Sequence, residues 1–190
     1  MNLDKAIQTR RSIRSFKDKK PNWRDIIEAI ETTTYAPMAG NIFSLRFMVI
    51  TDDKLIQRIA AWSEQDFIAQ TEYLVLFITR QDVVTNTFGE KGKDYAKQQA
   101  GAAIQNFLLK ITDLKLATCW IGHFNEKRIK EMLQIPEDRI IEAIFPIGYS
   151  KEKLKPKNKK ELFDKIFFNK WNHKTMQKEN IIEGRSPEGI

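Results

Sequence analysis

Residues 73–79 read Y-L-V-L-F-I-T, a continuous apolar run rich in β-branched and aromatic residues. A strand with one solvated face would alternate polar and apolar residues, and this run does not, so we expect a central strand buried on both faces. Three further strands are predicted at 46–51 (R-F-M-V-I-T), 116–122 (L-A-T-C-W-I-G) and 140–148 (I-I-E-A-I-F-P-I-G). Pro146 has no amide hydrogen, which places the end of the last strand at an edge or exit of the sheet.

Helices are predicted between these strands, the longest from residue 94 to about residue 114. Residues 81–93 are polar and contain two glycines, which predicts a mobile loop or lid. Strands that alternate with helices indicate a sheet covered by helices on both faces, although the strand order is not readable from sequence. The side chains that can cap the other helices are those of Asn2, Asn22, Asp52 or Asp53, and Asn125.

The composition describes a globular protein of one domain. The chain has 190 residues, 42% of them hydrophobic and 11% aromatic, which suffices for a sizeable core and excludes a disordered chain. The single cysteine, Cys119, excludes an intrachain disulfide and indicates a reducing compartment. The sequence shows neither an apolar run of membrane-spanning length nor a secretory signal, so we expect a cytoplasmic protein without membrane partners.

The net charge of +7 is concentrated at the two ends of the chain. Residues 1–24 carry +6, residues 151–190 carry +5, and the part between them carries −4. Two basic ends on an acidic body fit a nucleic-acid binder, and they equally fit an enzyme that holds a phosphorylated cofactor. Charge alone does not choose between these classes.

The densest basic stretch is residues 9–16, T-R-R-S-I-R-S-F. Arginine presents a planar fork of donors suited to phosphate, and serine hydroxyls can donate to the same oxygens. On composition alone, a solvated basic turn is the more frequent explanation of such a run. The anion-binding interpretation needs support from elsewhere in the chain.

Several familiar sites are not supported by the sequence. It contains no G-x-G-x-x-G, no P-loop, no nucleophile elbow, and too few histidines and cysteines for a zinc site. Cys119 lies within an apolar strand, where an inert thiol is the more frequent state. His123 follows a strand end, and its interpretations as a proton donor or as a surface histidine are equally open.

Three other features do point to a bound ligand. Asn41 stands in a loop of small residues before a strand, where its amide can read the edge of a heterocycle. Ile121 and Gly122 end another strand, and the glycine lets backbone approach a flat ligand. Residues 151–160 hold six lysines, which add cations for an anionic group.

Taken with the arginine stretch, these features resemble the FMN-dependent nitroreductase family. The resemblance covers roughly residues 3–171, and its pieces occur in the family's order. They are R-R-S-I-R-S-F at 10–16, A-P-M-A-G-N at 36–41, A-A-I-Q-N-F-L-L at 102–109, L-K-L-A-T-C-W-I-G at 114–122, M-L-Q-I-P-E-D at 132–138 and F-P-I-G-Y at 145–149.

The resemblance implies an α+β fold with a mixed central sheet covered by helices on both faces, in an intertwined homodimer with FMN at the subunit interface. In that family the flavin carries hydride chemistry, taking electrons from NADH or NADPH and passing them to a nitroaromatic, a quinone or a similar small acceptor in a ping-pong cycle. It implies no catalytic side chain and no metal.

Carried over by position, the FMN phosphate and ribityl chain are expected at Arg10, Ser12 and Arg14, with further contacts from Arg11. The ring is expected against the loop of Pro37, Met38, Ala39 and Asn41, and against Ile121 and Gly122, with a backbone N–H near its reactive nitrogen. A basic residue after the last strand completes the phosphate site; Lys159 is the first choice and Lys157 the second.

This chain departs from the family pattern in the second motif. Met38 replaces the common serine, and Phe43, Ser44 and Leu45 stand where Gln-Pro-Trp is usual. The departure leaves flavin binding in place as an expectation and puts the detailed contacts of that loop in doubt.

The domain plan follows from the same resemblance. Residues 1–150 are expected to form one FMN-binding domain, and residues 151–181 a basic arm with an apolar helix that wraps the dimer. Residues 182–190 begin with I-E-G-R, a common engineered protease site, and are interpreted as a tail outside the fold.

Two other functions stay open on sequence grounds. One is a flavin-binding storage or sensor protein with little turnover, which would hold FMN that NAD(P)H does not reduce. The other is a nucleic-acid binder using the basic ends, which leaves Asn41 and the Ile121–Gly122 strand end without a role and ranks last.

If the arginine stretch holds the FMN phosphate, Arg10→Ala should weaken flavin retention more than it alters folding, because a charge-assisted contact is lost at the surface. Arg14→Ala should behave in the same way. Flavin content after gel filtration, compared with the parent, measures this. An Arg10→Ala protein that keeps its flavin as well as the parent does would overturn the assignment.

Overall fold

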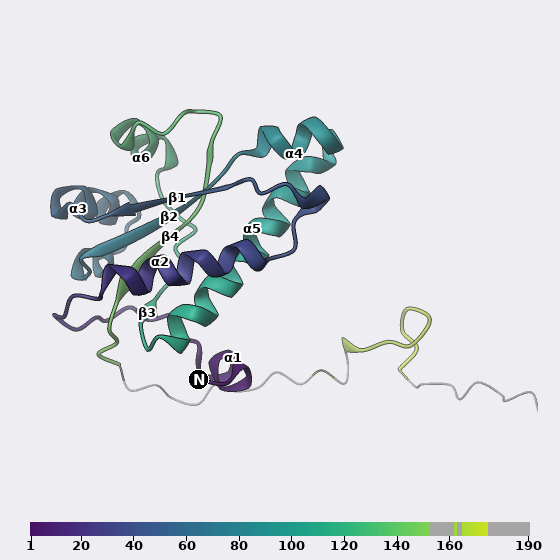
Figure 1. The fold of residues 1–190 in the computed structure, drawn as a ribbon, viewed down its shortest axis with the longest axis horizontal. Helices are drawn as coiled ribbons and strands as arrows, with labels where there is room; N and C mark the ends of the chain where they lie inside the picture. Colours follow the sequence, from purple (N-terminus) through teal and green to yellow (C-terminus); the bar gives the residue numbers. More distant parts are fainter. Residues whose placement is uncertain (153–161, 163–164, 175–190) are drawn as a thin grey trace, which may run out of the picture. The chain divides into compact units, whose positions relative to one another are not determined.

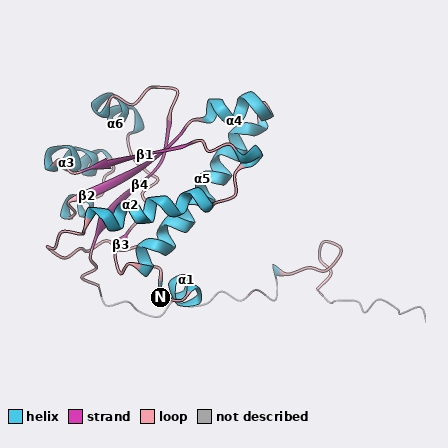
Figure 2. Ribbon diagram, viewed as in Figure 1, coloured by secondary structure: helices cyan, strands magenta, loops and turns pink. Residues whose placement is uncertain are grey.

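The computed structural model describes residues 1–152, 162 and 165–174, and it divides the chain into two compact units, residues 1–156 and residues 157–190. The first unit is built on a four-stranded sheet with helices packed against it (Figures 1 and 2). The strands are β1 (Leu45–Ile50), β2 (Tyr73–Thr79), β3 (Ala117–Thr118) and β4 (Ile140–Gly148), in the order β1-β2-β4-β3.

Strand β2 is the centre of this sheet. It pairs antiparallel with β1 on one side and with β4 on the other, and all seven of its residues are buried, as its composition predicts. Strand β3 also pairs antiparallel with β4. The pairings among the described strands are therefore all antiparallel, where a mixed sheet was expected.

One face of the sheet is covered by α3 (Asp53–Trp62) and α6 (Glu126–Leu133). Leu74, Leu76 and Ile78 of β2 point to this side and share one buried cluster with residues of both helices. The short helix η3 (Asp66–Gln70) adds Ile68 to the same cluster.

The opposite face is covered by α2 (Trp23–Glu31) and by the 23-residue α5 (Lys91–Asp113). Phe77 is the centre of a cluster of rings there, with its centroid 4.9 Å from that of Phe47 and 5.0 Å from those of Phe107 and Phe145. Edge-to-face contacts of this kind add to the stabilisation that comes from apolar burial. The expectation of helices on both faces is thus confirmed.

The predicted helix caps are also confirmed. The side chain of Asn2 accepts from Lys5 N at the start of α1 (Leu3–Thr9), and Asp52 accepts from two amides at the start of α3. Asn22 and Asn125 do the same for α2 and α6. Each cap satisfies an amide that would otherwise lack a helical partner.

Two predictions on the α5 side are wrong. The segment expected as a loop or lid contains α4 (Gln81–Phe88), and α5 begins three residues earlier than expected, at Lys91. Gly92 explains the tight connection, because a Cβ there would lie 2.6 Å from Thr85 Cα. Only glycine lets the first turn of α5 lie so close to the backbone of α4.

The strand predicted at 116–122 is interrupted. It forms β3 at residues 117–118, and then a single bridge between Ile121 and Ile144. The register from Thr118↔Ile147 to Ile121↔Ile144 is unbroken, so Cys119 stands opposite Pro146. Proline cannot donate there, and the ladder breaks at that position. Pro146 thus lies inside β4, between two paired strands, and not at the exit that was expected.

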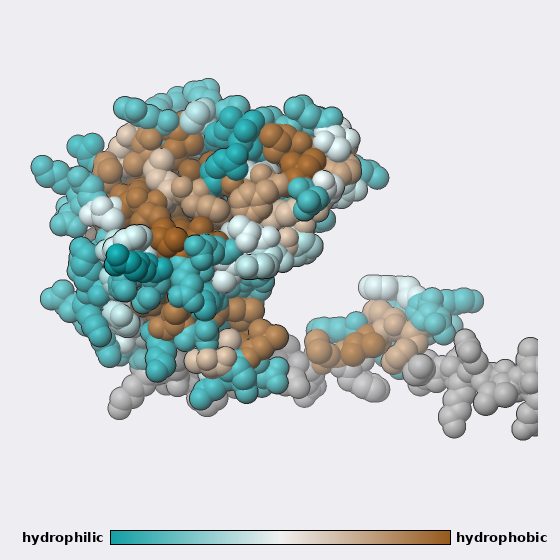
Figure 3. Space-filling view, viewed as in Figure 1, coloured by the Kyte–Doolittle hydropathy of each residue, from teal (hydrophilic) through white to brown (hydrophobic). Residues whose placement is uncertain are grey.

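Helix α2 does not bury all of its large apolar side chains. Ile26 and Ala29 are buried, but Trp23 is 49% exposed and Ile27 is 37% exposed. Val49, on edge strand β1, is also exposed, and hydrophobic side chains gather between β1 and α2 in the space-filling view (Figure 3).

In the second unit, residues 165–174 form bends and turns where an apolar helix was expected. Asn169 and Asn172 have positive φ angles of 60° and 68°, which do not continue a helix. The Phe167 and Trp171 rings still contact each other, at 4.6 Å between centroids. Lys157 and Lys159 lie outside the described residues.

Across the described residues, no helix combines the length and apolar character needed to span a bilayer. Helices of this length in a globular fold owe their stability to the packing of one face, and α2, α3 and α6 each pack one face against the sheet.

A β-bulge in β4 generates one testable property. Phe77 pairs with Ala143 and Ile78 with Ile141, so Glu142 is an extra residue between them. Burial raises the pKa of the Glu142 carboxyl above its ordinary value of 4.5, although the nearby Thr79 hydroxyl and Lys97 act in the opposite direction. Glu142 Oε1 and Thr79 Oγ1 are both buried without a hydrogen-bond partner in the described structure.

A carboxyl whose pKa is raised by folding stabilises the fold fully below its unfolded pKa, and that stability is lost as the pH rises through the folded pKa. Glu142→Gln should therefore raise the melting temperature at pH 8 and have little effect near pH 4. Glu131→Gln, on an exposed position of α6, removes the same charge without burial and serves as the control. A difference in melting temperature between Glu142→Gln and the parent that stays the same from pH 4 to pH 8 would contradict the prediction.

Candidate functional site

The arginine stretch is an extended segment fixed along the open edge of β3. Ile13 N donates to Thr118 O at 2.9 Å, and Phe16 bridges Ser150 just beyond β4. Ile13 and Phe16 are 4% and 1% exposed, so these two residues, three positions apart, anchor the segment. This excludes the solvated turn that composition alone favoured, because only the residues between the anchors reach the surface.

Arg10 and Arg11 line a pocket of about 250 Å³ between α1, the C-terminal end of α5 and β3. Its wall is apolar where Leu108 and Ile111 of α5 contribute, and Thr118 also lines it. The Thr118 hydroxyl is buried and has no hydrogen-bond partner among the residues described. Two arginines and an unsatisfied hydroxyl in one pocket wall fit an anionic group, although Arg11 Nη1 already donates to Gln8 O at 2.7 Å and to Arg10 O at 2.8 Å.

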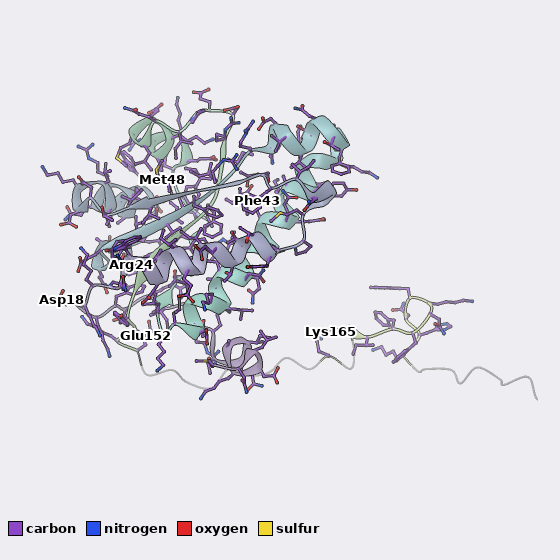
Figure 4. The ribbon with its side chains drawn as sticks, in the orientation of Figure 1. Asp18, Arg24, Phe43, Met48, Glu152 and Lys165 are labelled. Atoms are coloured by element: carbon purple, nitrogen blue, oxygen red, sulfur yellow. The ribbon has the colours of Figure 1, made fainter. Side chains whose placement is uncertain are left out.

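Ser12 and Arg14 are exposed and do not line this pocket. The Arg14 guanidinium lies 6.0 Å from the centroid of the Phe67 ring, and Arg14 N donates to Glu152 Oε1 at 2.9 Å. Glu152, which follows β4, is labelled in Figure 4. The four predicted phosphate ligands thus follow one segment but do not converge on one pocket.

Cys119 is buried next to this segment. Burial raises the pKa of the Cys119 thiol, and the charges of Arg14 and Arg10 and a hydrogen bond with Ser12 offset this only in part. The thiol is therefore protonated at neutral pH, in accord with the inert role expected for it.

The second predicted element, Pro37–Asn41, contains the short 3₁₀ helix η2 (Ala39–Asn41). Pro37 and Asn41 are exposed, while Met38 and Ala39 are half-buried. A pocket of about 330 Å³ is lined by Pro37, Met38 and Ala39 of this loop and by Tyr95, Gln98, Gln99 and Ala102 of α5. Gln99 holds the loop by its side chain and was missed by sequence reasoning, because a glutamine inside a helix carries no signal of its partners.

The third element is the strand end at Ile121 and Gly122. Ile121 exchanges both backbone hydrogen bonds with Ile144, at 3.0 Å each, so its N–H is not available to a ligand. Gly122 is exposed, and its N–H has no partner among the described residues. The backbone donor predicted near a ligand is therefore that of Gly122.

These elements do not all meet within one chain. The arginine stretch and the Ile121–Gly122 strand end adjoin each other through β3. The loop at Pro37–Asn41 is attached to α5 at Gln99, whereas the arginine pocket is walled by Ile111 of the same helix. Twelve residues of helix separate them by about 18 Å.

The residues present fit the expected cofactor. The pocket with Arg10, Arg11 and the unpaired Thr118 hydroxyl suits a phosphate, and the free N–H of Gly122 suits the polar edge of a ring. A metal centre is not supported, since the described residues contain no group of three or more metal-ligating side chains.

Known proteins resemble this chain in sequence and in fold. The sequence profile of the Nitroreductase family matches residues 7–82 and 61–149. An Archaeoglobus fulgidus protein named "Putative NADH dehydrogenase/NAD(P)H nitroreductase" is 26% identical over 180 residues, which cover 88% of this chain and 97% of that protein. The iodotyrosine deiodinase of Thermotoga neapolitana is 25% identical over 156 residues, covering 74% and 84% of the two chains.

Solved structures share the fold. A nitroreductase family protein from Clostridium novyi NT superposes with a TM-score of 0.72 at 25% identity, over 91% of this chain and 96% of that chain. An FMN-dependent nitroreductase from Clostridium difficile R20291 superposes with a TM-score of 0.75 at 23% identity, over 87% and 98%. The α+β fold predicted from the sequence is confirmed by these superpositions.

The packing of the arginine stretch against the end of β4 can be tested by substituting Gly148. A Cβ on this residue would lie 2.8 Å from Phe16 Cδ1, and the Phe16 ring is fully buried. Gly148→Ala should destabilise the protein by about 1–3 kcal/mol and weaken FMN binding, because it displaces an anchor of the stretch. Melting temperature and FMN titration measure the two effects.

Combining Gly148→Ala with Phe16→Leu makes room for the added methyl group and serves as the control. The double variant should bind FMN better than Gly148→Ala alone. Equal FMN affinity of Gly148→Ala and the parent would show that this anchor does not position the site.

Proposed function

Because the chain belongs to the nitroreductase family, we propose that it is an FMN-dependent oxidoreductase that uses NADH or NADPH to reduce a small acceptor. The family and the named relatives support a nitroreductase-type oxidoreductase. The Clostridium difficile neighbour, an FMN-dependent nitroreductase, supports FMN as the cofactor. Acceptors to be considered are nitroaromatics, quinones and, from the Thermotoga relative, iodinated phenols.

The observation that carries the proposal is the edge of β3. There an arginine stretch follows segments that carry a buried hydroxyl and a backbone N–H, neither of which has a hydrogen-bond partner among the residues that the structure describes. A ligand with a phosphate at one end and a polar planar ring at the other would satisfy all three. FMN has this chemistry.

When bound, FMN would supply the redox chemistry, accepting a hydride from NADH or NADPH and releasing electrons to the acceptor. Arg10 and Arg11 would hold the phosphate, with Ser12 and Arg14 available along the ribityl chain. Gly122 N–H would donate to the polar edge of the ring, where a fixed donor favours negative charge. Lys159 or Lys157 would add a cation, and no side chain is assigned as a catalytic acid or base.

We further propose that a second copy of the chain completes each site. Within one chain, the loop at Pro37–Asn41 lies about 18 Å along α5 from the arginine pocket, so the loop that would cover the ring is expected from the other subunit. The exposed apolar surface beside edge strand β1, with Trp23, Ile27 and Val49, supports burial against another chain.

Purified protein should be yellow, or become so with FMN, and should oxidise NADH or NADPH only when an acceptor is present. The assay compares a quinone, a nitroaromatic and an iodophenol without oxygen. Riboflavin, which lacks the phosphate, should bind far more weakly than FMN. In the same preparation, sedimentation should show about twice the chain mass of 22.3 kDa.

Each alternative has its own outcome in this assay. Bound FMN that neither NADH nor NADPH reduces would overturn the enzyme and favour a storage or sensor protein. Protein that takes up no FMN would overturn the cofactor assignment, and a monomer with full activity would overturn the shared site.

A further inference from the structure

The loop before β1 has an unusual backbone that its own hydrogen bonds do not fix in place. Gly40 and Asn41 both have a φ angle of 57°, in the left-handed region. Glycine adopts this region freely and asparagine tolerates it, but two such residues in succession need support from their surroundings. Within the loop only two turn bonds form, from Asn41 N to Met38 O and from Ile42 N to Ala39 O.

Gln99 of α5 supplies that support. Its side chain is 4% exposed and makes three hydrogen bonds to this segment. Oε1 accepts from Ala39 N at 3.1 Å, and Nε2 donates to Ile42 O at 3.2 Å and to Ser44 Oγ at 2.6 Å. Both amide hydrogens and the carbonyl oxygen are used, so the amide fits the loop in one orientation.

The same contacts link the loop to the rest of the sheet. Ser44 is fully buried, and Ser44 O accepts from Arg80 N just beyond β2, at 2.9 Å. On the outer side, a Cβ at Gly40 would lie 3.1 Å from Phe88 Cζ, so the Phe88 ring covers the loop there. Gln99 is therefore the polar anchor of a loop that is otherwise held by van der Waals contact.

We propose that Gln99 is a positioning residue, which holds the backbone at Ala39–Ile42 so that Pro37–Asn41 presents one fixed surface to the flavin ring. This rests on the proposed function, since that loop is where the ring is expected. Gln99 spends its side-chain hydrogen bonds on the loop backbone and on Ser44, so it acts on the flavin through the position of the loop. Methionine at this position has nearly the same length but neither donor nor acceptor, and the buried partners would be left unpaired.

The test uses full-length Gln99→Met with Asn106→Met as the matched control. Asn106 lies on the same helix, and its Nδ2 donates to Thr32 O at 3.3 Å. It is therefore a comparable hydrogen bond from α5 to a segment outside the loop. Two readouts are needed: the Kd and visible absorption spectrum of bound FMN, and hydrogen exchange of the peptide covering residues 36–44 in flavin-free protein.

Gln99→Met should weaken FMN binding by about tenfold, shift the absorption bands of the bound flavin, and speed exchange of residues 36–44 by a similar factor. Asn106→Met should lower the melting temperature, while the Kd and the visible spectrum of bound FMN stay those of the parent. Parental exchange in residues 36–44 of Gln99→Met would overturn the proposal whether or not the protein binds FMN.

The two proposals fail in different ways. If the parent itself takes up no FMN while Gln99→Met speeds loop exchange, Gln99 holds the loop and the proposed cofactor is wrong. If Gln99→Met speeds exchange yet binds FMN with the parental Kd and spectrum, the loop does not position the flavin, and the inference is wrong while the cofactor assignment stands.

Discussion

The structure depends on the burial of β2 on both faces. Its backbone is satisfied by β1 and β4, so the side chains decide what surrounds it, and seven buried residues in succession require an apolar layer on each side. Helices α3 and α6 supply one layer, and α2 and α5 supply the other. Ring contacts between Phe77, Phe107 and Phe145 connect α5 to two strands at once, which makes α5 part of the core as well as of the site.

A sheet organised in this way has two edges, and the proposed function uses both. At the β3 edge, Pro146 interrupts the ladder opposite Cys119, so β3 is short. Gly122 follows the hydrogen-bonded pair Ile121–Ile144, and its N–H has no partner among the described residues. The arginine stretch occupies the remaining edge of β3 through Ile13. At the β1 edge, apolar side chains are exposed, which supports the proposed second subunit.

Helix α5 also organises the loop before β1. Sequence comparison with the family marks Phe43, Ser44 and Leu45 as a departure from the usual Gln-Pro-Trp. In the structure, Ser44 and Leu45 are buried, and Ser44 receives a hydrogen bond from Gln99. The departure is therefore accompanied by a local network that fixes the loop, and the altered residues are part of it.

The sequence by itself determined the central strand, the helix caps at Asn2, Asn22, Asp52 and Asn125, and the family, because these depend on local preferences and on short motifs. It did not determine where α4 lies, since the close approach of Gly92 to Thr85 is a contact between two helices. Nor did it show that Arg10 and Arg11 line a pocket that Ser12 and Arg14 do not, because that division depends on which residues of the stretch are anchored against β3. The hydrogen bonds of Gln99 were equally out of reach, since its partners lie 55 to 60 residues away in sequence and meet it only when the sheet brings α5 against the start of β1. Only the tertiary structure decided these features. Each is a contact between two segments that are brought together by the fold, and the sequence around either segment does not identify its partner.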